Sequence, residues 1–249
     1  MYKFIVTYFL LLSVISFSVA ADTSNQTPEI ASQELTPYTV GYKATWKAGW
    51  FPITIDATRT LEKSNDEWKL SFEAYSSVAD LSEISYFDIK QNQISPIRYR
   101  YKTSGFLSKK LRVIEFNREK NKVWLPDQEI WGNYDLTNEI QDNLSYQEQI
   151  RLDLMAGKTQ LAYPVTYKNR LKNYEFAIVG DSKIKTPLGT FNATEVKQVG
   201  LDKNESNHIW LAKDYEYLII KLKITKSNGT SNTIELKHAK VGNKVLTGA

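Results

Sequence analysis

Apolar and polar residues alternate along most of this chain. Every second residue from Tyr38 to Trp46 is apolar, and the residues between them are mostly polar. Because neighbouring side chains of a β-strand point to opposite faces, a period of two predicts a strand with one buried face. The alternation returns at 53–61 and 68–76 after short turns, which predicts an antiparallel meander. We expect further strands at 97–102, 111–117, 123–124, 160–168, 173–180, 190–199, 206–211, 218–225 and 233–240.

One segment, Asp142–Gly157, has the spacing of a helix instead. Tyr146, Ile150 and Leu154 follow one another at intervals of four residues and form one apolar stripe. Asp142 can accept hydrogen bonds from the backbone N–H groups of the first turn, which have no partner inside the helix. Gly157 suits the left-handed conformation that often ends a helix. We therefore predict one helix that packs its apolar stripe against the strands.

About a dozen short strands and one helix predict a mainly β fold. A continuous antiparallel sheet of that many strands tends to curl or close. We expect one large curved antiparallel sheet, or a half-open β-barrel, with a single packed α-helix. Three segments are less regular: 78–87 has an ambiguous pattern that fits one helical turn, 126–141 is expected to be a polar connection, and Gly180-Asp181 is expected to form a turn.

The first residues have the pattern of a secretory signal peptide. Lys3 precedes an apolar run from Phe4 to Phe17, and small residues follow up to Ala21. The run is shorter than the roughly 20 residues that cross a bilayer, so a cleaved signal at 1–20 is favoured over a membrane anchor. Residues 21–36 are polar and are expected to be a mobile leader. Residues 37–249 are expected to be a single β-rich domain, without a transmembrane segment in the mature chain.

The absence of cysteine, combined with a signal peptide, favours the periplasm of a bacterium over a disulfide-stapled secreted domain. The chain has 32 Lys and Arg against 28 Asp and Glu, a weak positive charge. Its lysines are scattered rather than grouped with aromatic residues, so a nucleic-acid partner is not expected.

Several segments together resemble the bacterial domain-of-unknown-function family 3108 (DUF3108). They are LSYQEQIRLDLMAG, YPVTYKNRLKNYEFAIVG, KTPLGTFNATEVKQV and HIWLAKDYEYLIIKLKI, after the opening YTVGYKATWKAGWFPITIDATRTL. The resemblance covers about 37–237 and implies an exported β-rich protein without an established activity. Asn143 and Lys213 stand where the family often has proline, and neither change threatens the fold.

The segment 210–219 also resembles a strand–turn–strand of the periplasmic lipoprotein-carrier folds (LolA/LolB-like). Those folds are half-barrels whose concave face, closed by a helix, holds acyl chains. This resemblance is a generic hairpin pattern and implies only an analogous architecture.

Catalytic and metal-binding patterns are absent from the sequence. There is no cysteine nucleophile and no Gly-x-Ser-x-Gly motif, and only His208 and His238 could act as a histidine base. Two distant histidines do not make a transition-metal site, and there is no phosphate-binding loop. We therefore expect no enzyme, no cofactor and no metal. A hydrolase remains an alternative, with a carboxylate pair drawn from Glu73, Asp88, Glu115, Glu175 and Glu195.

The candidate ligand-binding residues are apolar and aromatic, with one polar pair. Trp50 and Phe51 lie in a turn bounded by Gly49, where an aromatic pair suits a membrane surface or the mouth of an apolar pocket. On the helix, Tyr146 and Ile150 are expected to face a ligand. Gln147 and Arg151 are neighbours on another face, and form either a polar clamp for a carboxylate or phosphate group or a tie to the sheet or solvent.

The sequence thus favours a non-catalytic periplasmic protein that binds or carries an apolar or lipid-like ligand between sheet and helix. The alternative is a cell-envelope interaction or assembly protein, whose partner protein contacts the sheet edges or the Trp50-Phe51 turn.

Overall fold

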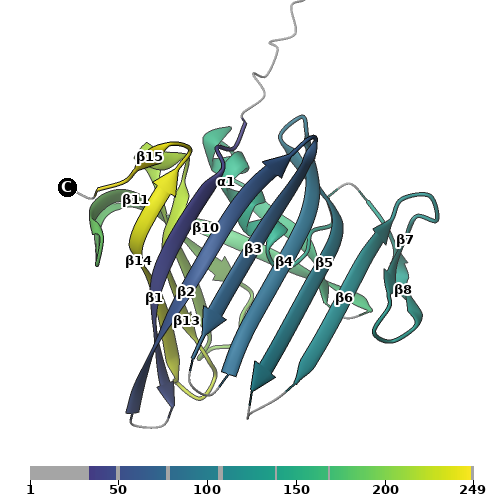
Figure 1. Ribbon diagram of the computed structural model, residues 1–249, viewed down its shortest axis with the longest axis horizontal. Helices are drawn as coiled ribbons and strands as arrows, with labels where there is room; N and C mark the ends of the chain where they lie inside the picture. Colours follow the sequence, from purple (N-terminus) through teal and green to yellow (C-terminus); the bar gives the residue numbers. More distant parts are fainter. Residues whose placement is uncertain are drawn as a thin grey trace, which may run out of the picture. The chain divides into compact units, whose positions relative to one another are not determined.

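The computed structural model describes residues 34–48, 51–76, 79–105, 109–137, 139–167 and 169–247 (Figure 1). These residues form one antiparallel sheet of 15 strands, with one α-helix and one short 3₁₀ helix. The helices are α1 (Ser145–Met155) and η1 (Lys213–Tyr215). The strands are β1 (Tyr38–Ala48), β2 (Phe51–Ser64), β3 (Glu67–Tyr75), β4 (Ala79–Lys90), β5 (Gln93–Gly105), β6 (Lys110–Asn117), β7 (Lys122–Leu125), β8 (Ile130–Asp135), β9 (Leu161–Tyr167), β10 (Arg170–Thr186), β11 (Gly189–Val199), β12 (Ser206–Ala212), β13 (Leu218–Thr225), β14 (Ser231–Val241) and β15 (Lys244–Val245).

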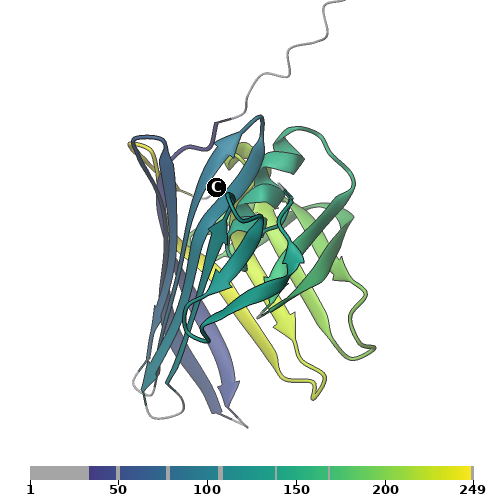
Figure 2. The same ribbon diagram turned by 90° about the vertical axis from the view of Figure 1, so that its right-hand side faces the viewer.

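The sheet consists of two meanders joined along β1 and β14. Its order is β8-β7-β6-β5-β4-β3-β2-β1-β14-β13-β12-β11-β10-β9, and β15 pairs with β14. No pairing between β8 and β9 closes the sheet in the described part of the chain. Figure 2 shows the two meanders as two facing arms, with α1 between them. The predicted fold, a large curved antiparallel sheet with one packed helix, is confirmed.

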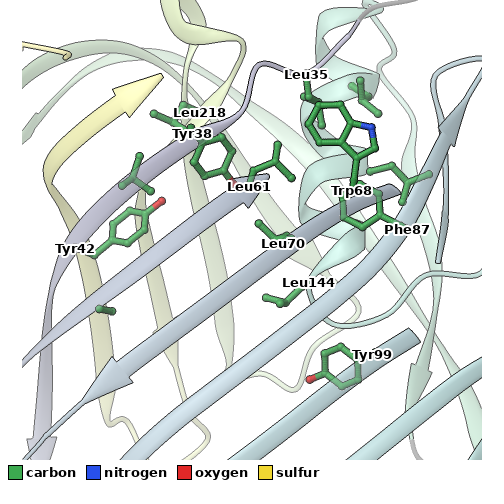
Figure 3. Packing of buried hydrophobic residues seen from close by; sticks show 14 of the residues in the cluster. Leu35, Tyr38, Tyr42, Leu61, Trp68, Leu70, Phe87, Tyr99, Leu144 and Leu218 are labelled. Carbon is green, nitrogen blue, oxygen red and sulfur yellow. The ribbon is translucent and has the colours of Figure 1, made fainter. Parts of the chain in front are cut away.

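The alternation along the strands places the large apolar side chains on the concave face. In β1, Tyr38, Val40 and Tyr42 are buried, whereas Thr39 and Lys43, which point to the other face, are exposed. Figure 3 shows the core that results from this pattern: side chains of β1, β2 and β3 point into one cluster, which a leucine at the start of the helix also enters. The labelled side chains of this cluster are Leu35, Tyr38, Tyr42, Leu61, Trp68, Leu70, Phe87, Tyr99, Leu144 and Leu218.

The helix α1 lies inside the predicted segment 142–157 but is shorter, since it begins at Ser145 and ends at Met155. The two residues predicted to end it act as expected. Asp142 Oδ1 accepts hydrogen bonds from the backbone N–H groups of Leu144 at 2.8 Å and Ser145 at 2.9 Å. Gly157 has φ +73°, the left-handed conformation. The helix differs from the prediction in its burial: besides the apolar stripe, Glu148, Gln149 and Arg151 are also buried. It is therefore an internal helix rather than one with a solvated face.

Three irregular segments have more strand than the sequence indicates. The segment 78–87 holds no helical turn among its described residues, because 79–87 belongs to β4. The expected connection 126–141 contains β8, and β10 runs through the expected turn at Gly180-Asp181. There the pairing with β11 shifts by one residue between Ile178 and Gly180, and Gly180 has φ +147°. A β-bulge, which the glycine accommodates, replaces the turn.

The folded part begins before Pro37. Leu35 is 1% exposed and belongs to the core, and Thr36 donates two hydrogen bonds to the Glu216 carboxylate, at 2.6 and 3.0 Å. The expectation that all of 21–36 is a mobile leader is therefore wrong for its last residues. The predicted signal peptide at 1–20 lies outside the described residues.

Within the described residues, no helix is long and apolar enough to cross a membrane.

Candidate functional site

A mainly apolar hollow lies on the concave face of β1–β5 and β14. It is a cavity of about 380 Å³. Its lining comes from the later residues of β1, β3 and β5 and the earlier residues of β2, β4 and β14. Because the strands are antiparallel, these residues all lie at one end of the sheet, and no residue of α1 is among them. The residues that line it are Ala44, Ile55, Ala57, Phe72, Ala74, Ser76, Ala79, Asp80, Leu81, Tyr101, Thr103, Asn232, Thr233 and Ile234.

The strand register explains why this wall is apolar and continuous. Ala57 pairs with Ala74, Ala74 pairs with Leu81, and Leu81 pairs with Thr103. Directly opposed residues of an antiparallel pair lie on the same face. One row of side chains therefore crosses four strands, and its alanines leave room above the sheet. Leu81 remains half-buried although it faces inward.

The same face is filled at the other end of the strands. There Leu61 pairs with Leu70, which pairs with Ser85, and Ser85 pairs with Tyr99. All four are buried, at 0 or 1% exposure. Their large or hydrogen-bonded side chains pack beneath the segment that begins the helix, since Ser85 Oγ donates to Asp142 Oδ2 at 2.6 Å. The concave face is thus divided into a packed half under α1 and an open apolar half.

A buried ionic network fixes α1 on the packed half. Glu148 lies between two guanidinium groups: Arg59 Nη2 donates to Oε1 at 2.8 Å, and Arg151 Nη1 donates to Oε2 at 2.6 Å. The hydroxyl of Tyr38 donates to the same Oε1 at 2.7 Å. Arg151 Nε also donates to the backbone carbonyl of Glu216 at 3.0 Å. All of Arg59, Glu148 and Arg151 are at most 3% exposed.

Burial and charge act in opposite directions on Glu148. Burial raises the pKa of the Glu148 carboxyl, but Arg151 and Arg59, with the hydrogen bond from Tyr38, outweigh burial and hold that pKa below its usual range. At Asp142 burial prevails, and the pKa is raised despite the hydrogen bonds from Ser85, Ser145 and Leu144. The fold therefore favours the charged form of Glu148 and disfavours that of Asp142, and neither residue lines the cavity.

Two further polar side chains connect α1 to opposite arms of the sheet. Gln149 accepts a hydrogen bond from the backbone N–H of Ile94 at 2.7 Å and donates to the carbonyl of Asn92 at 2.9 Å. Asp153 accepts from the hydroxyl of Tyr163 at 2.9 Å. Because these bonds reach β5, the turn before it and β9, the helix cannot leave the sheet without exposing unpaired polar groups.

The helix residues predicted to bind a ligand lie in the packed half. Tyr146 and Ile150 belong to an apolar cluster with Tyr163 and Phe176, and the Tyr146 and Phe176 rings stack at 5.9 Å. Gln147 accepts a hydrogen bond from Arg59 Nη1 at 2.7 Å.

Arg151 is 1% exposed and bound to Glu148, as in the alternative of a polar tie to the sheet. None of the four helix candidates, Tyr146, Gln147, Ile150 and Arg151, is among the described residues that line the cavity. Trp50 and the side chain of Phe51 lie outside the described residues.

Sequence reasoning missed the residues that line the cavity. The signal was present as Ala44, Ala57 and Ala74, which occupy inward positions of three successive strands where larger side chains would fill a core. Their common position became visible only through the register, because alanine by itself is an ordinary core residue.

The two histidines lie apart from the cavity, whose described lining contains no histidine. His208 Nδ1 is 2.6 Å from Glu195 Oε1, and its ring stacks on Trp210 at 5.7 Å. The His238 ring covers Gly41, where any side chain would collide with it. Neither histidine has a serine, threonine or second histidine as a hydrogen-bond partner among the described residues. No group of three His, Asp or Glu that could hold a metal occurs in the described ranges either.

Comparison with known families gives one match over most of the chain. The model of the family described as "Protein of unknown function (DUF3108)" matches residues 38–237. No curated protein matches the chain by sequence.

A solved structure shares the architecture at low sequence identity. A β-barrel-like protein of the family DUF1849 from Brucella abortus is 11% identical, with a TM-score of 0.57, over 84% of this chain and 99% of the other. This likeness shows the fold alone. A protein from Vibrio parahaemolyticus, assigned provisionally as an outer membrane lipoprotein-sorting protein domain, is 9% identical over 83% of this chain and 85% of the other. Its TM-score of 0.23 supports no inference.

Proposed function

Since the chain belongs to the DUF3108 family of proteins of unknown function, we propose its function from the site itself: it is a non-catalytic periplasmic protein that binds or carries an apolar or lipid-like ligand. The ligand lies in the cavity on the concave face of β1–β5 and β14, beyond the end of the space that α1 fills. The periplasmic location is supported by the signal-peptide pattern of 1–20 and the absence of cysteine.

The observation that carries this proposal is the apolar lining of the cavity. Phe72, Leu81, Tyr101 and Ile234 point into it and remain half-buried, although the adjoining rows of the same strands are packed. Apolar surface left in contact with water costs about 25 cal/mol per Å². A ligand that covers these side chains in the cavity removes that cost.

Ala74 offers a direct test. In the Ala74→Trp variant the indole occupies the cavity, so the neutral fluorophore phenylnaphthylamine should bind at least about tenfold more weakly than to the wild type, a loss of about 1.4 kcal/mol. Fluorescence titration measures this affinity. Ala177→Trp is the matched control, because Ala177 is exposed on β10, away from the cavity lining, and its substitution should leave the affinity unchanged.

Native mass spectrometry supplies the second readout. Protein purified without detergent should carry a bound mass that organic extraction removes and that Ala74→Trp lacks. If phenylnaphthylamine fails to bind the wild type, or binds wild type and Ala74→Trp equally, the cavity is not a ligand site and the carrier function is wrong.

A further inference from the structure

Three cationic side chains surround one tyrosine ring on the inner face of the sheet. The centroid of the Tyr167 ring lies 5.7 Å from Arg112 Cζ, 5.6 Å from Arg170 Cζ and 4.1 Å from Lys172 Nζ. A tyrosine ring attracts cations through the negative charge of its faces, which holds the three groups near one another. We call Arg112, Arg170 and Lys172 the basic cluster.

Strand register places the basic cluster on the concave face. Tyr167 pairs with Arg170, and Lys172 pairs with Val165, a core residue that is fully buried. Opposed residues share a face, so Lys172 and Arg170 point to the same side of β10 as the core does. These residues come from β9 and β10, at one edge of the sheet.

Arg112 connects the basic cluster to the cavity. It comes from β6, in the other arm, and pairs with Tyr101, which lines the cavity. The guanidinium carbon of Arg112 is 5.9 Å from the Tyr101 ring and 5.7 Å from the Tyr167 ring. The positive groups therefore begin where the apolar wall ends.

No carboxylate of the described residues lies within 4 Å of the basic cluster, since none of its three cations forms an ion pair there. The half-buried Glu83 is the acid whose charge reaches Arg112, and it is bound to the hydroxyl of Tyr99 at 2.6 Å. Three like charges gathered around one ring repel one another, and a bound anion would turn that repulsion into attraction.

We propose that the ligand is an acidic amphiphile: its hydrocarbon chain lies in the cavity, and its carboxylate or phosphate headgroup binds the basic cluster. Guanidinium groups suit both headgroups, because they donate two parallel hydrogen bonds to such oxygens. This inference rests on the proposed carrier function and adds the chemical class of the ligand.

The test compares dodecyl compounds that differ only in their headgroup. Laurate, dodecyl phosphate, dodecanol and dodecyltrimethylammonium each compete with phenylnaphthylamine on the wild-type protein at low ionic strength. The two anions should displace the fluorophore at about tenfold lower concentration than dodecanol does, and the cation should be the weakest. Inorganic phosphate alone should not displace it, because it has no chain to occupy the cavity. Added salt should weaken the anions and leave dodecanol unchanged.

The double variant Arg170→Gln/Lys172→Gln removes two charges of the basic cluster. This variant should bind laurate about tenfold more weakly than the wild type does. Its affinity for dodecanol should be unchanged, which would show that the fold is intact. The control Lys43→Gln/Lys197→Gln removes two charges from exposed positions that alternate with the buried Tyr42 and Val196, and it should bind laurate normally.

The possible results separate the two proposals. If phenylnaphthylamine binds but laurate and dodecanol compete equally, or if no dodecyl compound displaces it, the acidic-amphiphile inference is wrong while the carrier function stands. If inorganic phosphate displaces the fluorophore as well as dodecyl phosphate does, the headgroup alone is recognised and the inference is also wrong. If the fluorophore itself does not bind, the carrier function fails.

Discussion

At the scale of single residues, Glu148 joins segments that are far apart in the sequence. Its two oxygens accept hydrogen bonds from Tyr38, Arg59 and Arg151, which belong to β1, β2 and α1. Arg151 in turn binds Glu216, which also holds Thr36 at the beginning of the folded part. One carboxylate thus neutralises part of the charge of two buried guanidiniums, and removing it leaves both without an acidic partner at hydrogen-bond distance.

Glu148→Gln should lower the free energy of unfolding by about 3–5 kcal/mol, the usual cost of removing one partner from a buried ion pair. Urea denaturation measures this loss. The matched control is Asp56→Asn, because Asp56 is 73% exposed in its ion pair with Lys237 and should change stability by less than about 0.5 kcal/mol. A Glu148→Gln protein as stable as the Asp56→Asn protein would contradict the structural role of this network.

The same variant has a predicted pH dependence. The pKa of Glu148 is lower in the folded protein than in the unfolded chain, where it is about 4.3. Its contribution is therefore fully present above that value and is lost as the pH falls through the folded-state pKa. The stability difference between wild type and Glu148→Gln should shrink below about pH 4. Burial raises the pKa values of Asp142 and Glu83, whose effect has the opposite sign, but both proteins contain these groups.

At the scale of elements, α1 serves as the internal support of the curved sheet. Leu152 belongs to the larger apolar cluster with Leu144, whereas Ile150 and Leu154 belong to the smaller cluster with β9–β13. The helix therefore packs on both arms at once. Its capping residues were predicted correctly because capping is local, whereas the burial of its polar side depends on partners in β1, β2 and β5.

Leu154→Ala should cost about 2–5 kcal/mol of unfolding free energy, because the buried side chain leaves a cavity between helix and sheet. Leu111→Ala is the control, since Leu111 is 52% exposed on β6, and it should change stability by less than about 0.5 kcal/mol. Chemical denaturation of the two variants measures both losses of unfolding free energy. A near-zero loss for Leu154→Ala would mean that the helix is not docked on this cluster.

At the scale of the whole folded unit, the strands extend beyond the hydrophobic core that covers their concave face. The helix and the core side chains fill the concave face at one end of the strands, and the alanine row leaves the other end hollow. At the hollow end, Phe72, Tyr101 and Ile234 pack against the core but remain only half-buried. A ligand in the cavity would cover these side chains and stabilise the folded state by mass action.

Laurate at about 100 times its dissociation constant should stabilise the protein by about 2.7 kcal/mol. For a chain of this size that corresponds to a rise in Tm of about 5–10 °C. Thermal unfolding followed by circular dichroism measures the shift. Ala74→Trp should remove it and Ala177→Trp should retain it; an equal shift in both variants would place laurate outside the cavity.

Prediction from the sequence succeeded where a pattern is local. The alternation in β1 to β3 depends on neighbouring residues, and so do the bonds from the first turn of α1 to Asp142 and the left-handed Gly157 after it. It was wrong where pairing decides the structure: β4 and β8 have weak patterns of their own, and Gly180 suits a bulge as well as a turn. It missed the cavity residues, because their chemistry is that of an ordinary core.

The sequence by itself determined the mainly β fold, the presence of one helix and the absence of the common catalytic motifs, because each follows from residue types or from spacings of a few residues. Only the tertiary structure decided that Glu148 and Arg151 are bound to each other and to the sheet. It also brought Ala44, Ala57 and Ala74 to one wall, and Arg112 of one arm beside Tyr167 of the other. The physical reason is that register and sheet curvature bring together residues that are distant in the chain, and no local pattern records such an approach.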